Sequence, residues 1–132
     1  EGIIRTVVEQ REGAVIYHCS AGKDRAGVIS ALLLRLLGAE DSAIYADYLY
    51  TNTALSNELE EAQSAALALS GDERAANYVL GFFAACPCWL AAALDTLDKR
   101  FYSIEGYIAQ MTKVTGWEAE EFKRICIEKS PD

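Results

Sequence analysis

Residues 14–25 read AVIYHCSAGKDR, and the arrangement of the fold is expected to follow from this stretch. Its first part, Ala14 to Tyr17, is apolar and rich in β-branched side chains, a pattern typical of a buried strand. A cysteine, a glycine and an arginine follow, and a strongly apolar segment begins after them. The pattern predicts a strand over residues 14–18, a tight loop, and a helix that starts near Arg25.

The loop after this predicted strand, residues 18–25, has the features of an anion-binding site, and we call it the cysteine loop. Backbone N–H groups converge where a tight loop enters a helix, and the helix dipole adds positive potential there. The same field favours the thiolate of Cys19, which makes this residue the candidate nucleophile. Arg25 lies six positions later, where its planar guanidinium can bind two phosphate oxygens. Gly22 has no side chain and permits the turn between them.

The alternative is that Cys19 is a core cysteine and Arg25 an unrelated surface residue. A cysteine with an arginine six positions later is a common and weak pattern. Here the pair directly follows a β-branched run, encloses Gly22 and leads into an apolar helix. This combination favours a phosphate-binding loop.

Length, composition and charge limit the class of protein. The chain has 132 residues, of which 52% are hydrophobic, so one packed domain is expected. The net charge of −8 disfavours nucleic acid and broad membrane surfaces as partners. No apolar run reaches the ~18–20 residues of a membrane span, and the first residues lack the pattern of a signal peptide. We expect a single cytoplasmic domain over residues 1–132. Because the chain starts at Glu1 and without Met, it is expected to be either a mature product or, as the preferred interpretation, the C-terminal part of a longer domain.

The four cysteines, Cys19, Cys86, Cys88 and Cys126, have neither the spacing of a disulfide framework nor that of a zinc site. For Cys86-Pro87-Cys88 the alternative is a metal site, but the chain has one histidine and offers few other ligands. The preferred interpretation is two small, buried, apolar residues at the start of a helix. No metal or cofactor is therefore expected, and a reducing compartment fits this usage.

Apart from the strand, the chain is expected to be helical. Ile3, Ile4, Val7 and Val8 share one helical face before Gly13, and Gly38 is a natural stop for the apolar helix that precedes it. Further helices are predicted from Asp41 or Ser42 to about Leu49, over 55–69, 72–85 and 87–100, from Ser103, and after a capping box at Thr115–Glu118, with a Glu120–Arg124 pair on its exposed face. A lone strand cannot satisfy its own backbone groups, so a missing N-terminal segment or a second chain is expected to pair with it.

Residues 18–27 resemble the H-C-x-x-G-x-x-R signature of the tyrosine-phosphatase superfamily. The fuller form, H-C-x-A-G-K-D-R-x-G, is similar to that of bacterial and fungal tyrosine phosphatases with dual protein and phosphoinositide specificity. DYLYTN at 47–52 and SIEGYI at 103–108 are similar to that branch's D-Y-L-x-S/T-N and S-x-E-G-Y-L segments, whereas residues 54–100 match only in helical character. The resemblance implies an α/β cysteine-phosphatase fold, of which this chain is the mostly helical C-terminal portion with one sheet strand.

The same resemblance implies a metal-independent protein-tyrosine phosphatase that works through a phosphocysteine. Cys19 is then the nucleophile, Arg25 binds the phosphoryl oxygens, and Asp24 is the general acid. Lys23 would add a charge for a second phosphate or an inositol headgroup, so the implied substrate is a phosphotyrosine protein or a phosphoinositide. The implied phosphate-binding residues are Ser20, Ala21, Gly22, Lys23, Asp24 and Arg25.

Three further positions have supporting or unusual roles. His18 is expected to orient the loop by hydrogen bonds rather than to transfer protons. Asp47 either braces the helix after Gly38 or, in the functional alternative, orders the cysteine loop. At position 26 the superfamily usually has Ser or Thr, whose hydroxyl assists the sulfur as a leaving group, so Ala26 predicts slow hydrolysis of the phosphocysteine.

Three other functions are alternatives at this point. The first is a dedicated inositol-phosphate or phosphoinositide phosphatase, and the second is a phosphate-binding module without activity. The third is a sulfur-transfer or arsenate-reducing enzyme, which the Cys19–Arg25 spacing with Lys23-Asp24 disfavours.

Overall fold

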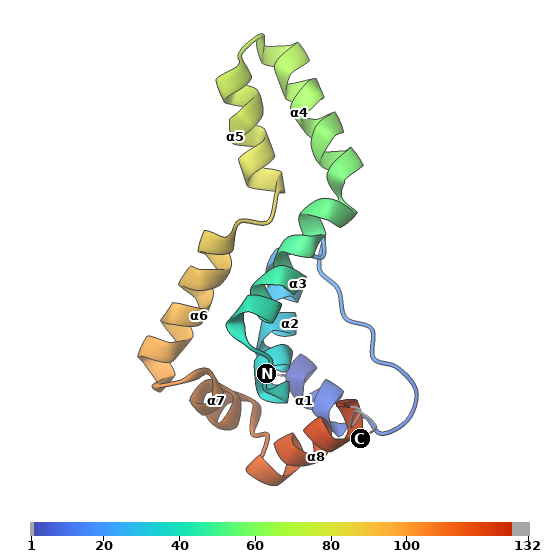
Figure 1. Ribbon diagram of the computed structural model, residues 1–132, viewed down its shortest axis with the longest axis vertical. Helices are drawn as coiled ribbons and strands as arrows, with labels where there is room; N and C mark the ends of the chain where they lie inside the picture. The colour runs from blue at the N-terminus through green and yellow to red at the C-terminus, as the bar shows by residue number, and fades with distance from the viewer. Residues whose placement is uncertain (1, 128–132) are drawn as a thin grey trace.

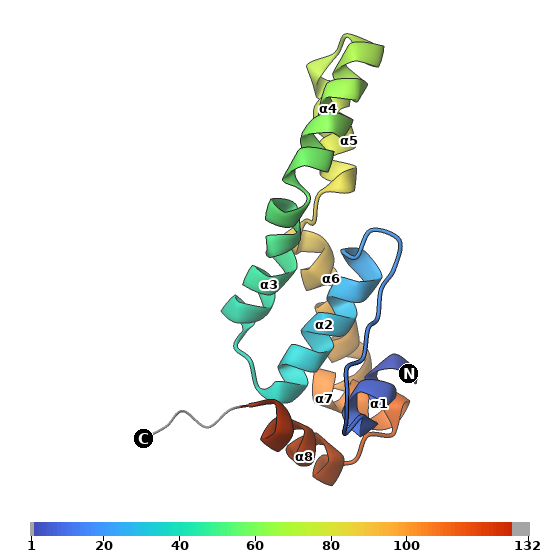
Figure 2. The ribbon, with the colours of Figure 1, turned by 90° about the vertical axis from the view of Figure 1, so that its right-hand side faces the viewer.

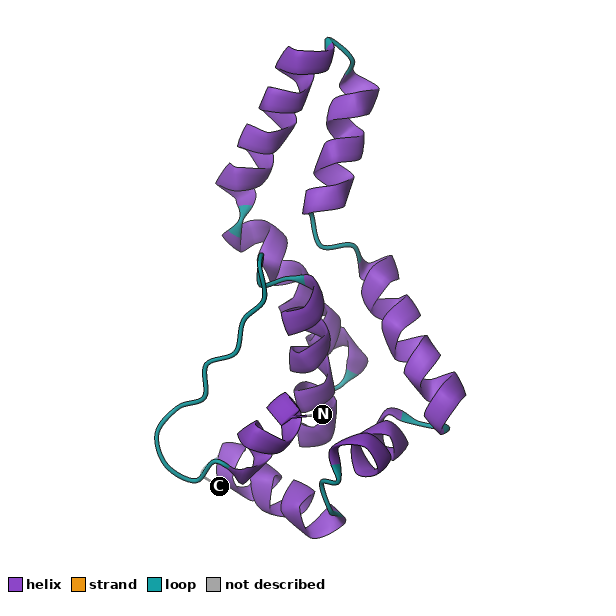
Figure 3. Ribbon diagram, turned by 180° about the vertical axis from the view of Figure 1, so that it is seen from behind, coloured by secondary structure: helices purple, strands orange, loops and turns teal. Residues whose placement is uncertain are grey.

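The computed structural model describes residues 2–127, and every regular element in this range is a helix (Figure 3). In chain order these are α1 (Gly2–Glu9), α2 (Asp24–Leu37), α3 (Asp41–Ala54), α4 (Ser56–Ser70), α5 (Glu73–Phe83), α6 (Pro87–Phe101), α7 (Ile104–Tyr107), the π-helical turn η1 (Ile108–Thr112) and α8 (Gly116–Cys126).

The strand predicted over residues 14–18 is wrong. The segment between α1 and α2 is an irregular loop that runs alone alongside α2, and the side chain of Ile16 is 89% exposed (Figures 1 and 2). A strand requires a neighbouring backbone for its ladder hydrogen bonds, and residues 2–127 contain no second strand. The described part of the chain is therefore all-helical rather than α/β.

The core surrounds α2, which contacts α1, α3, α6, α7 and α8. The prediction that this helix lies inside the fold is confirmed, because Ala31, Leu32, Leu33 and Leu36 are all buried. The largest fully buried side chains of the core are Ile4, Val8, Leu32, Ile44, Leu90 and Ile108. The C-terminal half of α2 is packed in this core. The N-terminal turn of α2 and the cysteine loop are therefore held at a fixed position.

Helices α4 and α5 form a hairpin that projects away from this core, at the top of Figure 1. Neither helix buries much: α4 has no buried residue, and α5 has only Ala76. The two helices contact each other, partly through a 2.8 Å hydrogen bond from Gln63 Nε2 to Asn77 Oδ1. Leu69 and Tyr78 remain 90% and 80% exposed, so the hairpin is held to the rest mainly at its base.

The helix boundaries follow local capping signals closely. The Asp72 and Ser103 side chains accept the N–H groups of Arg74 and Gly106, and the predicted capping box of α8 is present. Two expectations were wrong in detail. Helix α3 continues past Leu49 to Ala54, with Glu40 rather than Asp41 or Ser42 as its N-cap. The predicted Glu120–Arg124 pair is also absent from the described contacts, where Arg124 pairs with Glu121 and Lys123 with Glu120 at i,i+3 spacing.

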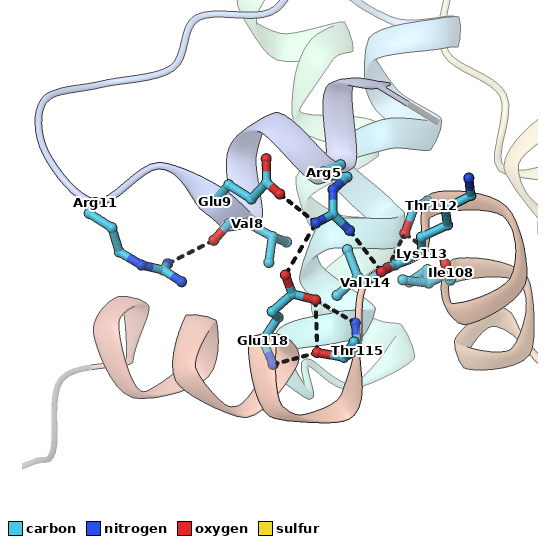
Figure 4. Close-up of polar contacts among 10 residues, drawn as sticks. All are labelled: Arg5, Val8, Glu9, Arg11, Ile108, Thr112, Lys113, Val114, Thr115 and Glu118. Carbon is cyan, nitrogen blue, oxygen red and sulfur yellow. Dashed lines mark hydrogen bonds and ion pairs between the residues drawn. The ribbon is translucent and has the colours of Figure 1, made fainter.

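Arg5 joins α1 to the turn before α8 (Figure 4). Its guanidinium donates to the Lys113 carbonyl at 2.8 Å and pairs with Glu9 at 2.6 Å and with Glu118 at 3.4 Å. Glu118 also accepts the N–H of Thr115 at 2.7 Å. The backbone and hydroxyl hydrogen bonds of Thr115, together with the charge of Arg5, lower the pKa of the Glu118 carboxyl.

The junction between α5 and α6 contains a disulfide between Cys86 and Cys88. Their interpretation as two buried thiols is wrong, because Cys86 is half-buried and Cys88 is exposed. Their Cα atoms lie 5.3 Å apart at the first turn of α6, within the range that a disulfide can bridge. The spacing of the four cysteines does not suit disulfides that close long loops, but a separation of two residues still allows Cys86 and Cys88 to form a small disulfide ring.

No single helix within residues 2–127 has the length and apolar character needed to cross a membrane. Only the combined pair α5 and α6, bent by 43°, satisfies those criteria, and it does so on length and composition alone.

Candidate active site

The cysteine loop ends at the first turn of α2. Gly22 has a φ of +71°, a left-handed conformation that glycine adopts without strain. Lys23 is the N-cap but makes no side-chain cap, and the Gly27 N–H is the first to bond to its carbonyl, at 3.0 Å. The N–H groups of Asp24, Arg25 and Ala26 therefore have no acceptor within the helix and are available to the loop.

Backbone amides of the cysteine loop and of the first turn of α2 act on Cys19. The N–H of Ala26 has the largest effect in lowering the pKa of the Cys19 thiol, and the N–H groups of Gly22 and Ala21 and the charge of Arg25 act in the same direction. Partial burial acts in the opposite direction and does not cancel them. The local backbone thus favours a thiolate, the form that can attack phosphorus.

Ala26 therefore has a role that the sequence analysis missed. At the sequence level only the missing hydroxyl of this residue was considered, whereas its backbone N–H lowers the pKa of the Cys19 thiol. Counting from the start of the helix could have found it, because the third residue of a helix always has an unpaired N–H.

Asp24 and Arg25 lie together on the wall of a hollow of about 480 Å³. Both residues are exposed, and the wall around them is mainly apolar and aromatic. Burial raises the pKa of the Tyr48 hydroxyl, and the charge of Asp24 acts in the same direction. The hollow is lined by Ile3, Tyr17, His18, Asp24, Arg25, Ala26, Val28, Ile29, Tyr48, Trp89 and Leu90.

Ser20 and Ala21 line a different hollow, of about 310 Å³, on the side of the α4–α5 hairpin. Its other lining residues are Leu55, Glu58, Leu59 and Phe83. The cysteine loop is therefore bordered by two hollows, and the sequence predicted neither of them.

Lys23 is directed into the protein rather than into solvent. Its side chain is 7% exposed, and its ammonium lies 2.9 Å from the Asp24 carboxylate, 3.4 Å from the Phe82 carbonyl and 4.8 Å from the centre of the Trp89 ring. The contacts with Phe82 and Trp89 have no signal in the sequence, because these residues lie about sixty positions further along the chain.

The supporting residues lie around the loop in different ways. His18 is exposed, and its Nδ1 is 3.3 Å from the Cys19 carbonyl oxygen. Asp47 is exposed on α3, and its side chain has no hydrogen bond or ion pair with another residue of the described range. Tyr17, from the loop between α1 and α2, instead bonds to Ser30 of α2, with 2.8 Å between the two hydroxyl oxygens. This bond fixes the segment that leads to Cys19.

The part of the chain that the structure describes contains no group of three or more histidine, cysteine, aspartate or glutamate side chains that could hold a metal ion.

Comparison with known proteins gives a consistent family. The sequence profile described as "Tyrosine phosphatase family" matches residues 1–128. A triple specificity protein phosphatase of Mycobacterium tuberculosis is 34% identical over 71% of this chain and 37% of its own length. A tyrosine-protein phosphatase of Nostoc commune is 44% identical over 35% of this chain and 16% of its own length. The chain thus spans well under half the length of these relatives, and it belongs to the tyrosine phosphatase family.

Proposed function

We propose that this protein hydrolyses the phosphate monoester of phosphotyrosine in proteins, through a phosphocysteine and without a metal ion. The observation that carries the proposal is the set of backbone amides, from Ala26, Gly22 and Ala21, that act on the Cys19 sulfur beside the charge of Arg25. This arrangement supplies an activated nucleophile and a cationic binding group at one helix N-terminus.

The first step forms one bond and breaks one. The Cys19 thiolate attacks phosphorus, the S–P bond forms, and the bond from phosphorus to the tyrosine oxygen breaks. Asp24 gives a proton to that leaving oxygen, and Arg25 binds the phosphoryl oxygens as charge builds on them.

In the second step water attacks phosphorus, the S–P bond breaks, and the Cys19 thiolate is released. Asp24 accepts the proton from water, so the site returns to its starting state. Inorganic phosphate leaves.

The hollow beside Asp24 and Arg25 supports an aryl phosphate as substrate. Its wall contains Tyr17, Tyr48 and Trp89, which suit the planar ring of a phosphotyrosine. The Mycobacterium tuberculosis relative is named for three specificities. Substrate breadth is therefore measured with phosphotyrosine, phosphoserine and phosphothreonine peptides and a phosphoinositide in parallel.

The proposal is tested in the full-length protein with chelator present. Cys19→Ser is expected to abolish turnover of a phosphotyrosine peptide while vanadate still binds, because an alcohol is a poor nucleophile and the amides are unchanged. The matched control is Cys126→Ser at the exposed free thiol of α8, which should keep full activity. Substantial turnover by Cys19→Ser would remove the assigned nucleophile, and vanadate binding without turnover in the unmodified protein would favour a phosphate-binding module.

Arg25→Lys provides the second test. Lysine keeps the charge but loses the two-pronged geometry, so kcat should fall by about 10²-fold or more. A lysine variant with nearly normal kcat would make Arg25 a structural residue.

A further inference from the structure

Lys23 is a cation of the cysteine loop that is held away from solvent. A buried ammonium loses its hydration, and this loss must be offset by partners within the protein. Lys23 has three: the Asp24 carboxylate at 2.9 Å, the Phe82 carbonyl at 3.4 Å and the face of Trp89, with 4.8 Å to the ring centre. Its donors are thus engaged before any substrate arrives.

These partners come from three separate elements. Asp24 is the first residue of α2, Phe82 belongs to the last turn of α5, and Trp89 belongs to the first turn of α6. Lys23 is therefore the point at which the cysteine loop contacts the junction between α5 and α6.

The junction is itself fixed from a fourth element. Asn52 of α3 accepts the Ala85 N–H at 2.7 Å and donates to the Ala85 carbonyl at 2.9 Å. Ala85 lies between Phe82 and Trp89 in the sequence and is buried. The contacts of Lys23 with Phe82 and Trp89 are therefore made with a segment that hydrogen bonds fix to α3.

We propose that Lys23 is a positioning residue: clamped between Trp89 and the Phe82 carbonyl, its ammonium holds the Asp24 carboxylate in place beside Arg25. Asp24 needs such a partner because its side chain is 55% exposed, and Lys23 is the cation with which it pairs. Trp89 lines the same hollow as Asp24, so the clamp lies at the edge of the substrate site. The inference rests on the proposed function, since it uses the role of Asp24 as general acid.

The inference makes a specific kinetic prediction. Lys23 acts through Asp24 and does not touch the substrate, so its loss should slow only reactions that need a proton on the leaving oxygen. Tyrosine is a poor leaving group and needs that proton, whereas nitrophenol leaves without it. A residue with a merely structural role would slow both substrates alike.

The experiment compares kcat for a phosphotyrosine peptide and for nitrophenyl phosphate in the full-length protein. Lys23→Met is expected to lower the peptide rate by about tenfold and to leave the nitrophenyl rate within about twofold. The matched control is Lys99→Met, at an exposed lysine of α6, which should change neither rate.

Lys23→Arg is the control that distinguishes loss of the positioning role from loss of folding in Lys23→Met. Arginine keeps the charge and stacks on aromatic rings, so the ratio of the two rates should stay within about threefold of the original. A ratio as low as that of Lys23→Met would overturn the proposal, as would equal slowing of both substrates by Lys23→Met. So would an effect of Lys23→Met confined to KM for a phosphoinositide, because this would make Lys23 a direct ligand.

Asp24→Asn, measured in the same assay, distinguishes a failure of the acid role of Asp24 from a failure of the positioning role of Lys23. If it slows both substrates equally, the acid role of Asp24 fails and the proposed function must be revised. If it slows only the peptide while Lys23→Met slows neither, the acid role stands and the positioning role alone is wrong.

Discussion

The ring of Tyr48 lies against the backbone of Gly27 so closely that a Cβ at position 27 would be 2.8 Å from both Cδ2 and Cε2. This contact joins α3 to the first turn of α2, directly after the cysteine loop, and Tyr48 is 3% exposed there. It gives a physical reason for a glycine near the loop and an aromatic residue in the DYLYTN segment.

We expect Gly27→Ala to destabilise the protein by about 1–3 kcal/mol, because the added methyl group forces the buried Tyr48 ring or the helix to move. Thermal unfolding measures the loss. The matched control is Gly81→Ala in α5, where an added Cβ meets nothing within 4 Å, so the higher helix propensity of alanine should be neutral or stabilising. Equal effects of the two substitutions would contradict the contact.

Cys19 is expected to be alkylated by iodoacetamide at a lower pH than an ordinary thiol. The amides of Ala26, Gly22 and Ala21 and the charge of Arg25 lower the pKa of its thiol from the usual 9.0, so the thiolate persists below that pH. The measurement is the rate of labelling at Cys19 against pH, with the site read by mass spectrometry in a Cys126→Ser background. Urea-unfolded protein should give the midpoint of an ordinary thiol, and a folded midpoint at or above it would contradict the prediction.

Ala26→Ser should speed the second chemical step. Without a hydroxyl at this position, hydrolysis of the phosphocysteine is expected to limit turnover, and rapid mixing should show a burst of leaving group. The added hydroxyl should raise the steady rate by about 10- to 150-fold, equivalent to one hydrogen bond to a charged group of about 1.5–3 kcal/mol. The backbone N–H of residue 26 is kept, so the burst rate itself should change little.

A burst-free unmodified protein would place the bottleneck at or before attack by Cys19. In that case Ala26→Ser should leave the steady rate unchanged. A burst together with an unaffected steady rate would mean that another group stabilises the departing thiolate.

Glu118 should make stability depend on pH in the acid range. Hydrogen bonds from Thr115 and the charge of Arg5 lower the pKa of this carboxyl in the folded state below the ordinary value of 4.5. The stabilisation is therefore fully present above about pH 4.5 and is lost as the pH falls through the lower, folded value. Glu118→Gln should lower the unfolding temperature at pH 7, and the difference from the unmodified protein should shrink as the solution is acidified below pH 4.5.

The exposed Glu60 of α4 provides the control for that series. Glu60→Gln should give an unfolding curve that follows the unmodified protein at every pH. A Glu118→Gln difference that stays constant down to the lowest pH would show that the carboxylate charge does not contribute.

Much of the local structure was predictable from the sequence. Three helix caps follow from residues within a few positions of one another: the N-cap of α5 at Asp72, the capping box of α8 and the C-cap of α2 at Gly38. The chemistry of the cysteine loop also follows from nearby residues, because the amides that act on Cys19 belong to positions 21, 22 and 26. Helices and helix N-termini satisfy their hydrogen bonds locally, so their signals are contained in short stretches of sequence.

The tertiary structure decided what depends on a distant partner. A β-branched run at Ala14–Tyr17 did not make a strand, because strand formation needs a second backbone that residues 2–127 do not supply. In the same way, only the packing of α5 and α6 brought Phe82 and Trp89 to Lys23 and turned its ammonium inward. A side chain's direction depends on which charges and rings surround it, and here those groups come from parts of the chain that meet only when it folds.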